Sequence, residues 1–378
     1  MRILFVQYTP RWTGPSKSLA HLVRGLGPVH EPVVALPGTG ALSEALDEAG
    51  VRRITLPAIT KWQLPRLAGI VRRERFDVVY ANSLSSTARI GLVAARLGGA
   101  AFVCHVREMG WGKSWLRLGY LWPADAVVAV SEACGASVRR FVRRGRLHVV
   151  HNGVPESELR PGSERDRAHL RVELGLPPDA RVILSVAHVC ERKGQEHAVR
   201  ALQRLAGSVP GVHLALVGAR DREPAYVRRL EAAARSWGLE GRVHLAGFRQ
   251  DAARLLRGAD LVVHTAAADP HPRAVLEAMA AGRAVVAFDV DGVSETVVDG
   301  VTGRLVAPGD ADALSAAIGE LLARPNRAAA MGVAGRERVA ERFTTTATTA
   351  GVLRVLDSLN VATGEADSSR ARITRPPA

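Results

Sequence analysis

The chain has 378 residues, of which 47% are hydrophobic and 23% charged, and its formal net charge is +14. This length and composition indicate two packed domains and exclude general disorder. Cys104, Cys134 and Cys190 lack any short spacing, which argues against a disulfide framework or zinc site and favours a reducing cytosol. The opening apolar run is too short for a signal peptide, and no window reaches the roughly 20 apolar residues of a membrane-spanning helix.

The positive charge is concentrated in the first part of the chain. Residues 1–150 carry 21 Lys and Arg against 9 Asp and Glu, whereas residues 151–378 carry 30 against 28. Such a one-sided field attracts nucleic acid, anionic lipid or a phosphorylated substrate. The alternative is that these arginines only cover solvated helices.

Short β-branched runs alternate with longer amphipathic runs from the first residue, which predicts βα units around a parallel sheet. In the first half we expect strands at 2–7, 32–37, 52–57, 77–82, 101–106, 125–130 and 147–150. Helices are expected between them, for example at 16–26, 41–50 and 83–99.

Residues 151–180 interrupt this alternation, because they are rich in proline, glycine and charge and are typical of a linker that leads into a short helix. A second Rossmann-like alternation follows, with strands at 181–187, 212–218, 242–248, 259–265 and 283–289 and closing helices at 310–323, 326–342 and 345–359. We therefore predict domains at 1–160 and 161–345. A closing helix at 346–360 is expected to cross back to the first domain, and 361–378 to be a disordered tail.

Two doubly wound domains in tandem leave a cleft between the carboxyl ends of their sheets, where ligands of such sheets bind. A strand over 185–189 leads to Gly194, which permits a tight turn, with Arg192 and Lys193 beside the next helix. Backbone N–H groups, a helix dipole and a lysine together form a diphosphate site. The alternative is a helix preceded by two solvated cations.

A second cluster follows the strand at 259–265. Asp269 lies in the loop, Pro272 and Arg273 begin a helix, and Glu277 lies one turn inside it. The two carboxylates are expected to converge above the strand ends and to accept hydrogen bonds from sugar hydroxyls. The N–H groups near Arg273 and Ala274 would face a phosphate. The alternative is that Glu277 only complements its helix dipole.

Taken in order, these elements resemble the retaining glycosyltransferases of family 4, which have the α/β GT-B fold with two Rossmann-like domains facing each other across a deep cleft. The matching runs are SVAHVCERKGQEHAVRAL, LALVG, VHLAGFRQDAARLLRGADLVV, DPHPRAVLEAMAAGRAVVA and GVSETVVDGVTGRLVAPGD, with ADAVVAVSEACGASV and VVHNGVP in the first half. The family's motif of two glutamates with seven residues between them falls on Asp269 and Glu277.

The resemblance implies a role for each matching residue. Lys193 would neutralise the donor diphosphate and the leaving nucleotide, Glu277 would hold the ribose hydroxyls, and Asp269 the transferred sugar. His271, Pro272, Arg273 and Ala274 would contact sugar and phosphate through their backbone. Gly14 would let the backbone approach a substrate closely, and His105 would meet the reacting sugar, although a strand-end histidine can also be purely structural.

Three positions depart from the family pattern. His188 stands where the family usually has an arginine, so one diphosphate charge is missing unless Arg192 supplies it from another direction. Asp269 is shorter than the usual glutamate by one methylene, and the usual glycine pair is reduced to Gly14 and Pro15. These departures leave the nucleotide, the sugar and the acceptor open.

The implied reaction is transfer with retention from a nucleotide-sugar to a glycan, lipid-linked or small-molecule acceptor, without a metal or other cofactor. The expected chemistry is positioned electrostatic stabilisation of the leaving diphosphate. The rival mechanism is double displacement with Asp269 as the nucleophile.

The sequence Asp289-Val290-Asp291 could suggest a metal site, but it ends a strand at a glycine-rich loop of this family.

Two other functions share some of these features. Sugar-nucleotide epimerases have the same architecture, but they need an acid/base set, and only His105 and Asp269 are candidates. A basic nucleic-acid-binding protein would explain the charge, but the chain has no recognised binding motif, so we expect no nucleic-acid partner.

The basic first half also suggests how an acceptor is reached. Residues 107–123 interleave Trp111, Trp115 and Trp122 with Arg107, Lys113 and Arg117. Aromatic and cationic side chains on an amphipathic helix suit an anionic membrane interface. We therefore expect a cytoplasmic protein that associates peripherally with the inner face of the membrane, the alternative being core tryptophans beside solvated arginines.

Overall fold

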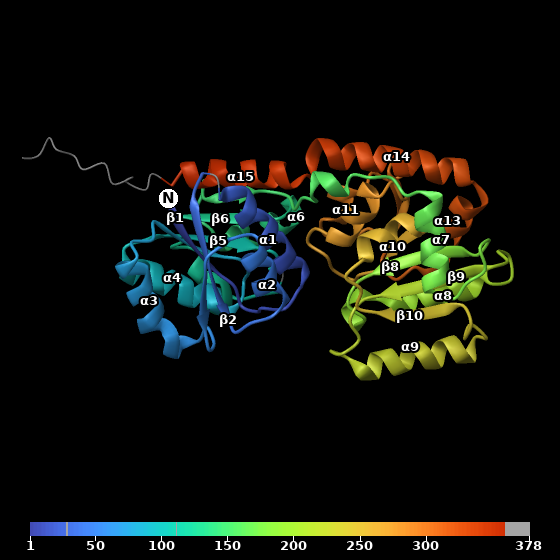
Figure 1. The fold of residues 1–378 in the computed structure, drawn as a ribbon, viewed down its shortest axis with the longest axis horizontal. Coiled ribbons are helices and arrows are strands. Elements are labelled where there is room, and N and C mark those ends of the chain that lie inside the picture. Colours follow the sequence, from blue (N-terminus) through green and yellow to red (C-terminus); the bar gives the residue numbers. More distant parts are fainter. Residues whose placement is uncertain (28, 111, 360–378) are drawn as a thin grey trace, which may run out of the picture.

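A computed structural model describes residues 1–27, 29–110 and 112–359 of the chain. They form two α/β units that lie side by side, the first coloured blue to teal and the second green to orange in Figure 1. The expected disordered tail and Trp111 lie outside the described residues.

The first unit is built on a parallel sheet in the order β3-β2-β1-β4-β5-β6-β7. Its strands are β1 (Arg2–Val6), β2 (Glu31–Pro37), β3 (Arg53–Leu56), β4 (Val78–Ala81), β5 (Ala101–Val106), β6 (Ala126–Ala129) and β7 (Leu147–Val149). Its helices are α1 (Gly14–Leu26), α2 (Ala41–Glu48), α3 (Leu64–Arg73), α4 (Ser86–Gly98), α5 (Trp115–Leu118) and α6 (Glu132–Val138).

Both faces of this sheet are covered, because alternate residues of each strand point to opposite sides. Leu4 and Val6 pack in the core beneath α3 and α4, whereas Ile3 and Phe5 pack in the core beneath α1 and α2. Burial on both sides explains why the strands are almost continuously apolar.

The second unit repeats this plan with a parallel sheet in the order β10-β9-β8-β11-β12-β13. Its strands are β8 (Arg181–Val186), β9 (Val212–Val217), β10 (Val243–Gly247), β11 (Leu261–His264), β12 (Val285–Phe288) and β13 (Gly303–Val306). Its helices are α7 (Glu164–Glu173), α8 (Gln195–Leu205), α9 (Pro224–Ser236), α10 (Ala252–Gly258), α11 (Arg273–Ala280), α12 (Val293–Thr296), α13 (Ala311–Ala323) and α14 (Pro325–Arg342).

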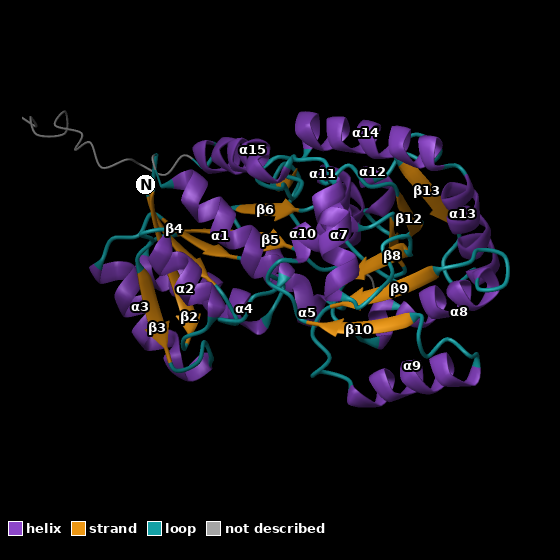
Figure 2. Cartoon of the chain, turned by 45° about the vertical axis from the view of Figure 1, so that its right-hand side comes forward, coloured by secondary structure: helices purple, strands orange, loops and turns teal. Residues whose placement is uncertain are grey.

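The last described helix, α15 (Thr345–Asp357), returns to the first unit, as the sequence predicted. It runs over the first sheet next to α1, whereas α14 covers the second unit (Figures 1 and 2). Val352, Val355 and Leu356 are buried with α1 and α2 in the same core. The first and the last described helices therefore share one domain, which ties the units together.

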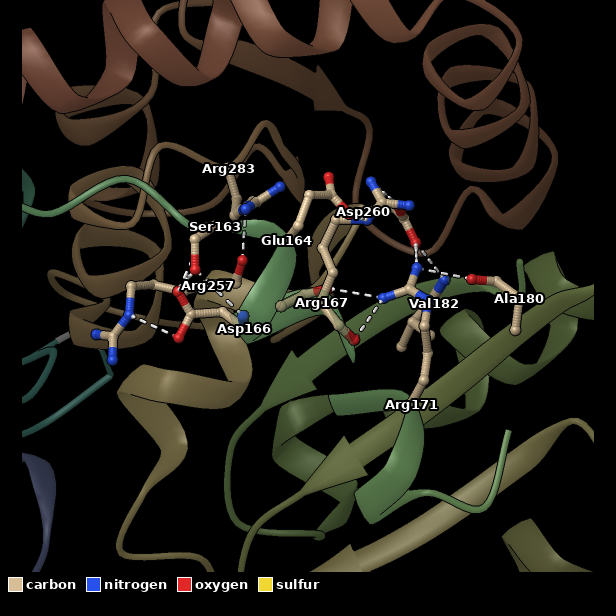
Figure 3. A network of polar contacts seen from close by, with 11 residues as sticks. Ser163, Glu164, Asp166, Arg167, Arg171, Ala180, Val182, Arg257, Asp260 and Arg283 are labelled. Carbon is tan, nitrogen blue, oxygen red and sulfur yellow. Dashed lines mark hydrogen bonds and ion pairs between the residues drawn. The ribbon is translucent and has the colours of Figure 1, made fainter. Parts of the chain in front are cut away.

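A buried polar network fixes the helix that follows the linker to the second sheet (Figure 3). The side chain of Arg171 is 2% exposed and donates to Asp260 Oδ2 at 2.7 Å and to the carbonyl of Ala180 at 2.7 Å. Asp260 also accepts the N–H of Val182 at the start of β8. A buried guanidinium of this kind is stable because acceptors satisfy it from several directions. This network orients the second sheet relative to the linker.

Three details differ from the sequence prediction. The second sheet has a sixth strand, β13, at Gly303–Val306, which was not among the five predicted strands. β8 ends at Val186 and not at 189, because the chain turns there, so His188 lies in a loop. The amphipathic helix expected near 107–123 is reduced to the four residues of α5 and a 3₁₀ turn over Gly119–Leu121.

Candidate functional site

Each sheet has one point where the chain order reverses, between β1 and β4 in the first unit and between β8 and β11 in the second. The loops that leave the carboxyl ends of strands at such points form the ligand crevice of doubly wound folds. Here these loops face each other and enclose a cavity of about 540 Å³ between the units. The cavity is lined from β1–α1 by Gly14 and Ser18, and from the second unit by Lys193 and Asp269.

Lys193 and Asp269 meet at the second unit's wall of this cavity. Lys193 Nζ lies 2.5 Å from Asp269 Oδ2, and His264 Nε2 lies 3.3 Å from the same oxygen. Burial would raise the pKa of Asp269, but Lys193 and His264 together lower it well below the usual value. Asp269 therefore stays ionised in a buried position.

Local backbone geometry brings the lysine there. Residues Glu191–Lys193 form a 3₁₀ turn that ends at Gly194, with φ of +61°. A Cβ atom at Gly194 would lie 2.3 Å from the carbonyl oxygen of Thr265, so only glycine fits between the two loops. The predicted tight turn is confirmed, and it brings the loops that carry Lys193 and Asp269 together.

Glu277 lies behind this wall, 10% exposed, and the other domain supplies one of its partners. Lys17 Nζ of α1 lies 2.9 Å from Glu277 Oε1, and Arg273 Nη2 lies 3.3 Å from the same oxygen. Burial raises the pKa of Glu277, whereas Lys17 and Arg273 lower it by more. Lys17 has no counterpart in the sequence prediction, since nothing in an amphipathic helix marks a partner 260 residues away.

Arg273 joins the two units at the start of α11. Its Nη1 donates to Ser18 Oγ and to the carbonyl of Gly153, each at 3.0 Å. Its side chain is therefore held by the interface, and it also lines the cavity. The helix begins at Pro272 and Arg273, as predicted, with Pro272 as its N-cap. Neither Pro272 nor Ala274 is among the residues that line the cavity.

The predicted diphosphate loop also lines the cavity. His188 and Arg192 both belong to its wall, and Arg222 from the loop after β9 lies there as well. Burial lowers the pKa of His188, and Arg222 lowers it further by repulsion. Arg222 was missed by the sequence prediction, because one arginine in an exposed charged loop has no distinguishing pattern.

His271 lies in the cavity wall, 3% exposed. Burial and the neighbouring His151 lower the pKa of His271 to about 3, so its ring is neutral. Neither ring nitrogen has a hydrogen-bond partner among the described residues. The ring packs against His151 and Phe343, so it forms part of the buried support of the wall.

The expected placement of His105 at the reacting centre is wrong. The residue is fully buried in β5 and is not part of the cavity wall. Its Nδ1 contacts Tyr80 Oη at 2.8 Å, and burial followed by repulsion from Arg107 lowers its pKa well below the usual value. The strand alternation directs this side chain into the core beneath the cavity.

Arg107 also differs from expectation. It was grouped with surface cations, but it is 7% exposed, and it lines the cavity two residues beyond His105. It donates to Asn82 Oδ1 at 2.8 Å and to Asn152 Oδ1 at 2.7 Å. Asn152 in turn donates to the carbonyl of His271 at 3.2 Å. The cationic pattern of residues 107–123 concealed this buried arginine.

Gly14 is the first residue of α1 and not part of a free loop, since Thr13 caps the helix. It lines the cavity, and a Cβ atom there would lie 3.8 Å from Arg273 Cδ, in ordinary contact. The glycine therefore leaves space at this point without being sterically required.

A second contact between the units lies at α6. Glu295 accepts the N–H groups of Glu132 at 2.8 Å and Ala133 at 2.9 Å, and His151 Nε2 lies 3.0 Å from it.

Asp291, in the sequence that could suggest a metal site, has φ of +44°, and burial raises its pKa. Within the described part of the chain, His, Cys, Asp and Glu side chains do not gather in a group of three that could hold a metal ion.

Comparison with known proteins identifies the chain. The family model described as Glycosyltransferase Family 4 matches residues 12–158, and the model described as Glycosyl transferases group 1 matches residues 166–338. A GDP-mannose-dependent alpha-(1-6)-phosphatidylinositol monomannoside mannosyltransferase of Mycolicibacterium smegmatis is 30% identical over 368 residues, 89% of this chain and 92% of the relative. The chain belongs to glycosyltransferase family 4.

Other members support this placement of the glycosyltransferase. A D-inositol 3-phosphate glycosyltransferase of Xylanimonas cellulosilytica is 33% identical and covers 75% of this chain and 67% of its own length. The crystal structure of HepE from Anabaena in complex with UDP-glucose superposes with a TM-score of 0.87 and 25% identity, over 95% of this chain and all of HepE. The enzyme has the GT-B fold, as the sequence predicted.

The Lys193–Asp269 pair generates a pH prediction. The pKa of Asp269 lies below the unfolded value of about 3.9, so its stabilising effect is present at neutral pH and lost in acid. In Lys193→Met, the buried carboxylate of Asp269 loses its cation, which destabilises the folded state at neutral pH by about 3 kcal/mol. The difference in Tm between wild type and Lys193→Met is therefore largest at pH 7 and shrinks towards pH 4.

Circular dichroism melts across this pH range measure that difference. The control is the double variant Lys193→Met with Asp269→Asn, which removes both charges and is expected to lose the pH dependence. A difference in Tm that stays constant with pH would contradict the pairing.

Proposed function

We propose that the enzyme is a retaining glycosyltransferase that moves a sugar from a nucleoside-diphosphate donor to a glycan, lipid-linked or small-molecule acceptor. The observation that carries this proposal is the Lys193–Asp269 pair at the switch point of the second sheet, facing the first domain across the cavity. Relatives named for GDP-mannose and for D-inositol 3-phosphate, and HepE in complex with UDP-glucose, support a nucleotide-sugar donor.

In the proposed donor pose, Lys193 and Arg192 face the diphosphate, with the N-terminal end of α8 following them. Arg222 beside His188 supplies a cation near the position where the family usually has an arginine. His188 itself stays neutral at pH 7 because its pKa is lowered, so it serves as a hydrogen-bonding group and not as a fixed charge.

Glu277 is proposed to hold the ribose. Both of its cations contact Oε1, and no hydrogen bond to Oε2 occurs within the described ranges, which leaves this oxygen for a hydroxyl. Asp269 is proposed to accept a hydroxyl of the transferred sugar, with the backbone of His271 to Ala274 beside it. Lys193 pairs with Asp269 Oδ2, and His264 Nε2 lies 3.3 Å from the same oxygen. These neighbours fix the position of the aspartate carboxylate in the cavity wall, although its side chain is shorter than the glutamate usual in the family.

The proposed mechanism is departure of the diphosphate and attack of the acceptor on the same face of the sugar. Fixed cations stabilise the leaving group, and this electrostatic effect is the main contribution expected from the protein. Double displacement through Asp269 is disfavoured, because Oδ2 of this carboxylate is already held by Lys193. The proposal includes no metal and no other cofactor.

Donor binding tests the assignment of residues. Titration with UDP-, GDP- and ADP-sugars is expected to identify one preferred nucleotide. Lys193→Ala should weaken that donor by about 10- to 100-fold, because a hydrogen bond between charged groups is lost, and Glu277→Gln by about tenfold. Arg24→Gln on the exposed side of α1 is the matched control. An unchanged donor affinity in Lys193→Ala and Glu277→Gln would refute the site.

The reaction type has its own test. With donor and acceptor in a buffer that contains a chelator, NMR of the product is expected to show the anomeric configuration of the donor. With donor alone, an epimerase would convert the sugar, whereas we expect slow hydrolysis at most. A glycosyl adduct on Asp269 found by mass spectrometry would establish double displacement instead.

We also propose a cytoplasmic enzyme that binds peripherally to the inner face of an anionic membrane, where a lipid-linked acceptor would lie. No helix within the described ranges combines the length and apolarity needed to cross a bilayer. The support is an aromatic-basic surface near α5, in which Leu116 is 88%, Trp115 53% and Trp122 45% exposed. Arg89 donates to the carbonyls of Leu116 and Arg117, which places cations beside these apolar groups.

Sedimentation with vesicles that contain phosphatidylglycerol tests the membrane proposal. Binding is expected at low salt and to fall as salt increases, because lipid charge is screened. Leu116→Ser should reduce binding several-fold, since it removes the most exposed apolar group of the surface. Val172→Ser, which changes an exposed valine of α7 in the second domain, is the control. Equal binding by wild type and Leu116→Ser would refute this surface.

A further inference from the structure

Arg107 is a buried cation whose counterion is missing from the first domain. Its nearest charged neighbour in sequence, Glu108, is exposed and lies 3.7 Å from Lys113. No carboxylate lies within ion-pair distance of Arg107 among the described residues, whereas Arg273, the other buried arginine of the cavity wall, pairs with Glu277. Arginine is almost never fully buried without a paired charge, so this one indicates an anion that is bound during function.

The hydrogen bonds of Arg107 leave part of its guanidinium unused. Nε donates to Asn82, Nη1 donates to Asn152, and Nη2 lies 3.3 Å from His105 Nδ1, which is already contacted by Tyr80 at 2.8 Å. A guanidinium has five N–H groups, so one hydrogen on each terminal nitrogen remains. Two such hydrogens are what a bidentate contact with an oxyanion requires.

Arg107 lies apart from the cations proposed to bind the donor diphosphate. Lys193 and Arg192 lie on the second domain, whereas Arg107 follows β5 of the first domain. Asn152 fixes Arg107 to the carbonyl of His271, in the loop where we place the transferred sugar. An anion on Arg107 would therefore lie beside the proposed place of the reacting sugar, on the wall of the cavity that the first domain forms.

We infer that Arg107 binds an oxyanion of the acceptor, so that this enzyme glycosylates an acidic acceptor carrying a phosphate or a carboxylate near the attacking hydroxyl. This inference rests on the proposed transferase function. Asn82 and Asn152 each accept a hydrogen bond from the guanidinium and hold it in place. Arg107 also lines the cavity, where an acceptor could reach it. A lysine could supply the charge at this point but not the planar fork.

The test uses the full chain saturated with the nucleoside diphosphate identified in the donor titration. This nucleotide occupies Lys193 and Arg192, the proposed diphosphate-binding cations, so that they cannot bind the added anion. Inorganic phosphate and glucuronate are then titrated separately by calorimetry at low ionic strength, and these two arms distinguish a phosphate from a carboxylate. We expect at least one of them to bind saturably. Arg107→Gln should weaken that binding by about tenfold or more while nucleotide affinity stays unchanged, because a charge-assisted contact is lost.

If Arg107→Gln does not fold, Arg107→Lys replaces it in the test, because lysine keeps the positive charge within the polar network. Arg107→Lys should bind the anion less tightly than the wild type does. Arg24→Gln is the control for loss of an arginine. Anion binding that is absent, equal in the variants, or abolished by nucleotide would overturn the inference, as would a loss of nucleotide affinity in Arg107→Gln. Failure of the wild type to bind any nucleotide would instead contradict the proposed function itself.

Discussion

Asp269 and Glu277 are buried carboxylates, and each remains ionised only because a cation lies against it. Lys193 reaches Asp269 within the second domain, whereas Glu277 takes Lys17 from the first domain and Arg273 from its own helix. Desolvation of an unpaired carboxylate would raise its pKa and favour the neutral form. The charge state of the cleft therefore depends on both domains being held in their present arrangement.

That arrangement is maintained away from the cleft. α15 buries apolar residues against α1, so this last described helix is part of the first domain's core. Glu295 accepts two N–H groups at the start of α6, and Arg273 reaches Ser18 and Gly153. Because these contacts are polar and surround the cavity, they can exchange with ligand groups, whereas the apolar contact of α15 is expected to persist.

The two walls of the cavity have different electrostatic roles. In the second domain the charges of Lys193 and Asp269 neutralise each other, because the two side chains form an ion pair. Arg192 and Arg222 line the same wall and add positive charge for a donor diphosphate. In the first domain Arg107 is surrounded by neutral partners. This asymmetry is consistent with one wall that recognises a nucleotide-sugar and another that recognises a separate anion.

The sequence alone determined the order of helices and strands apart from β13, the family, and the loop residues Lys193 and Asp269, because hydrophobic periodicity, turn glycines and short-range spacing are local properties. It did not determine the partners of Glu277, the burial of His105 or the position of Arg107. Lys17 reaches Glu277 from 260 positions away, and the partners of His105 and Arg107 come from neighbouring strands and the linker, up to 45 positions away. Only tertiary packing decides which of these charges meet and which are left unpaired.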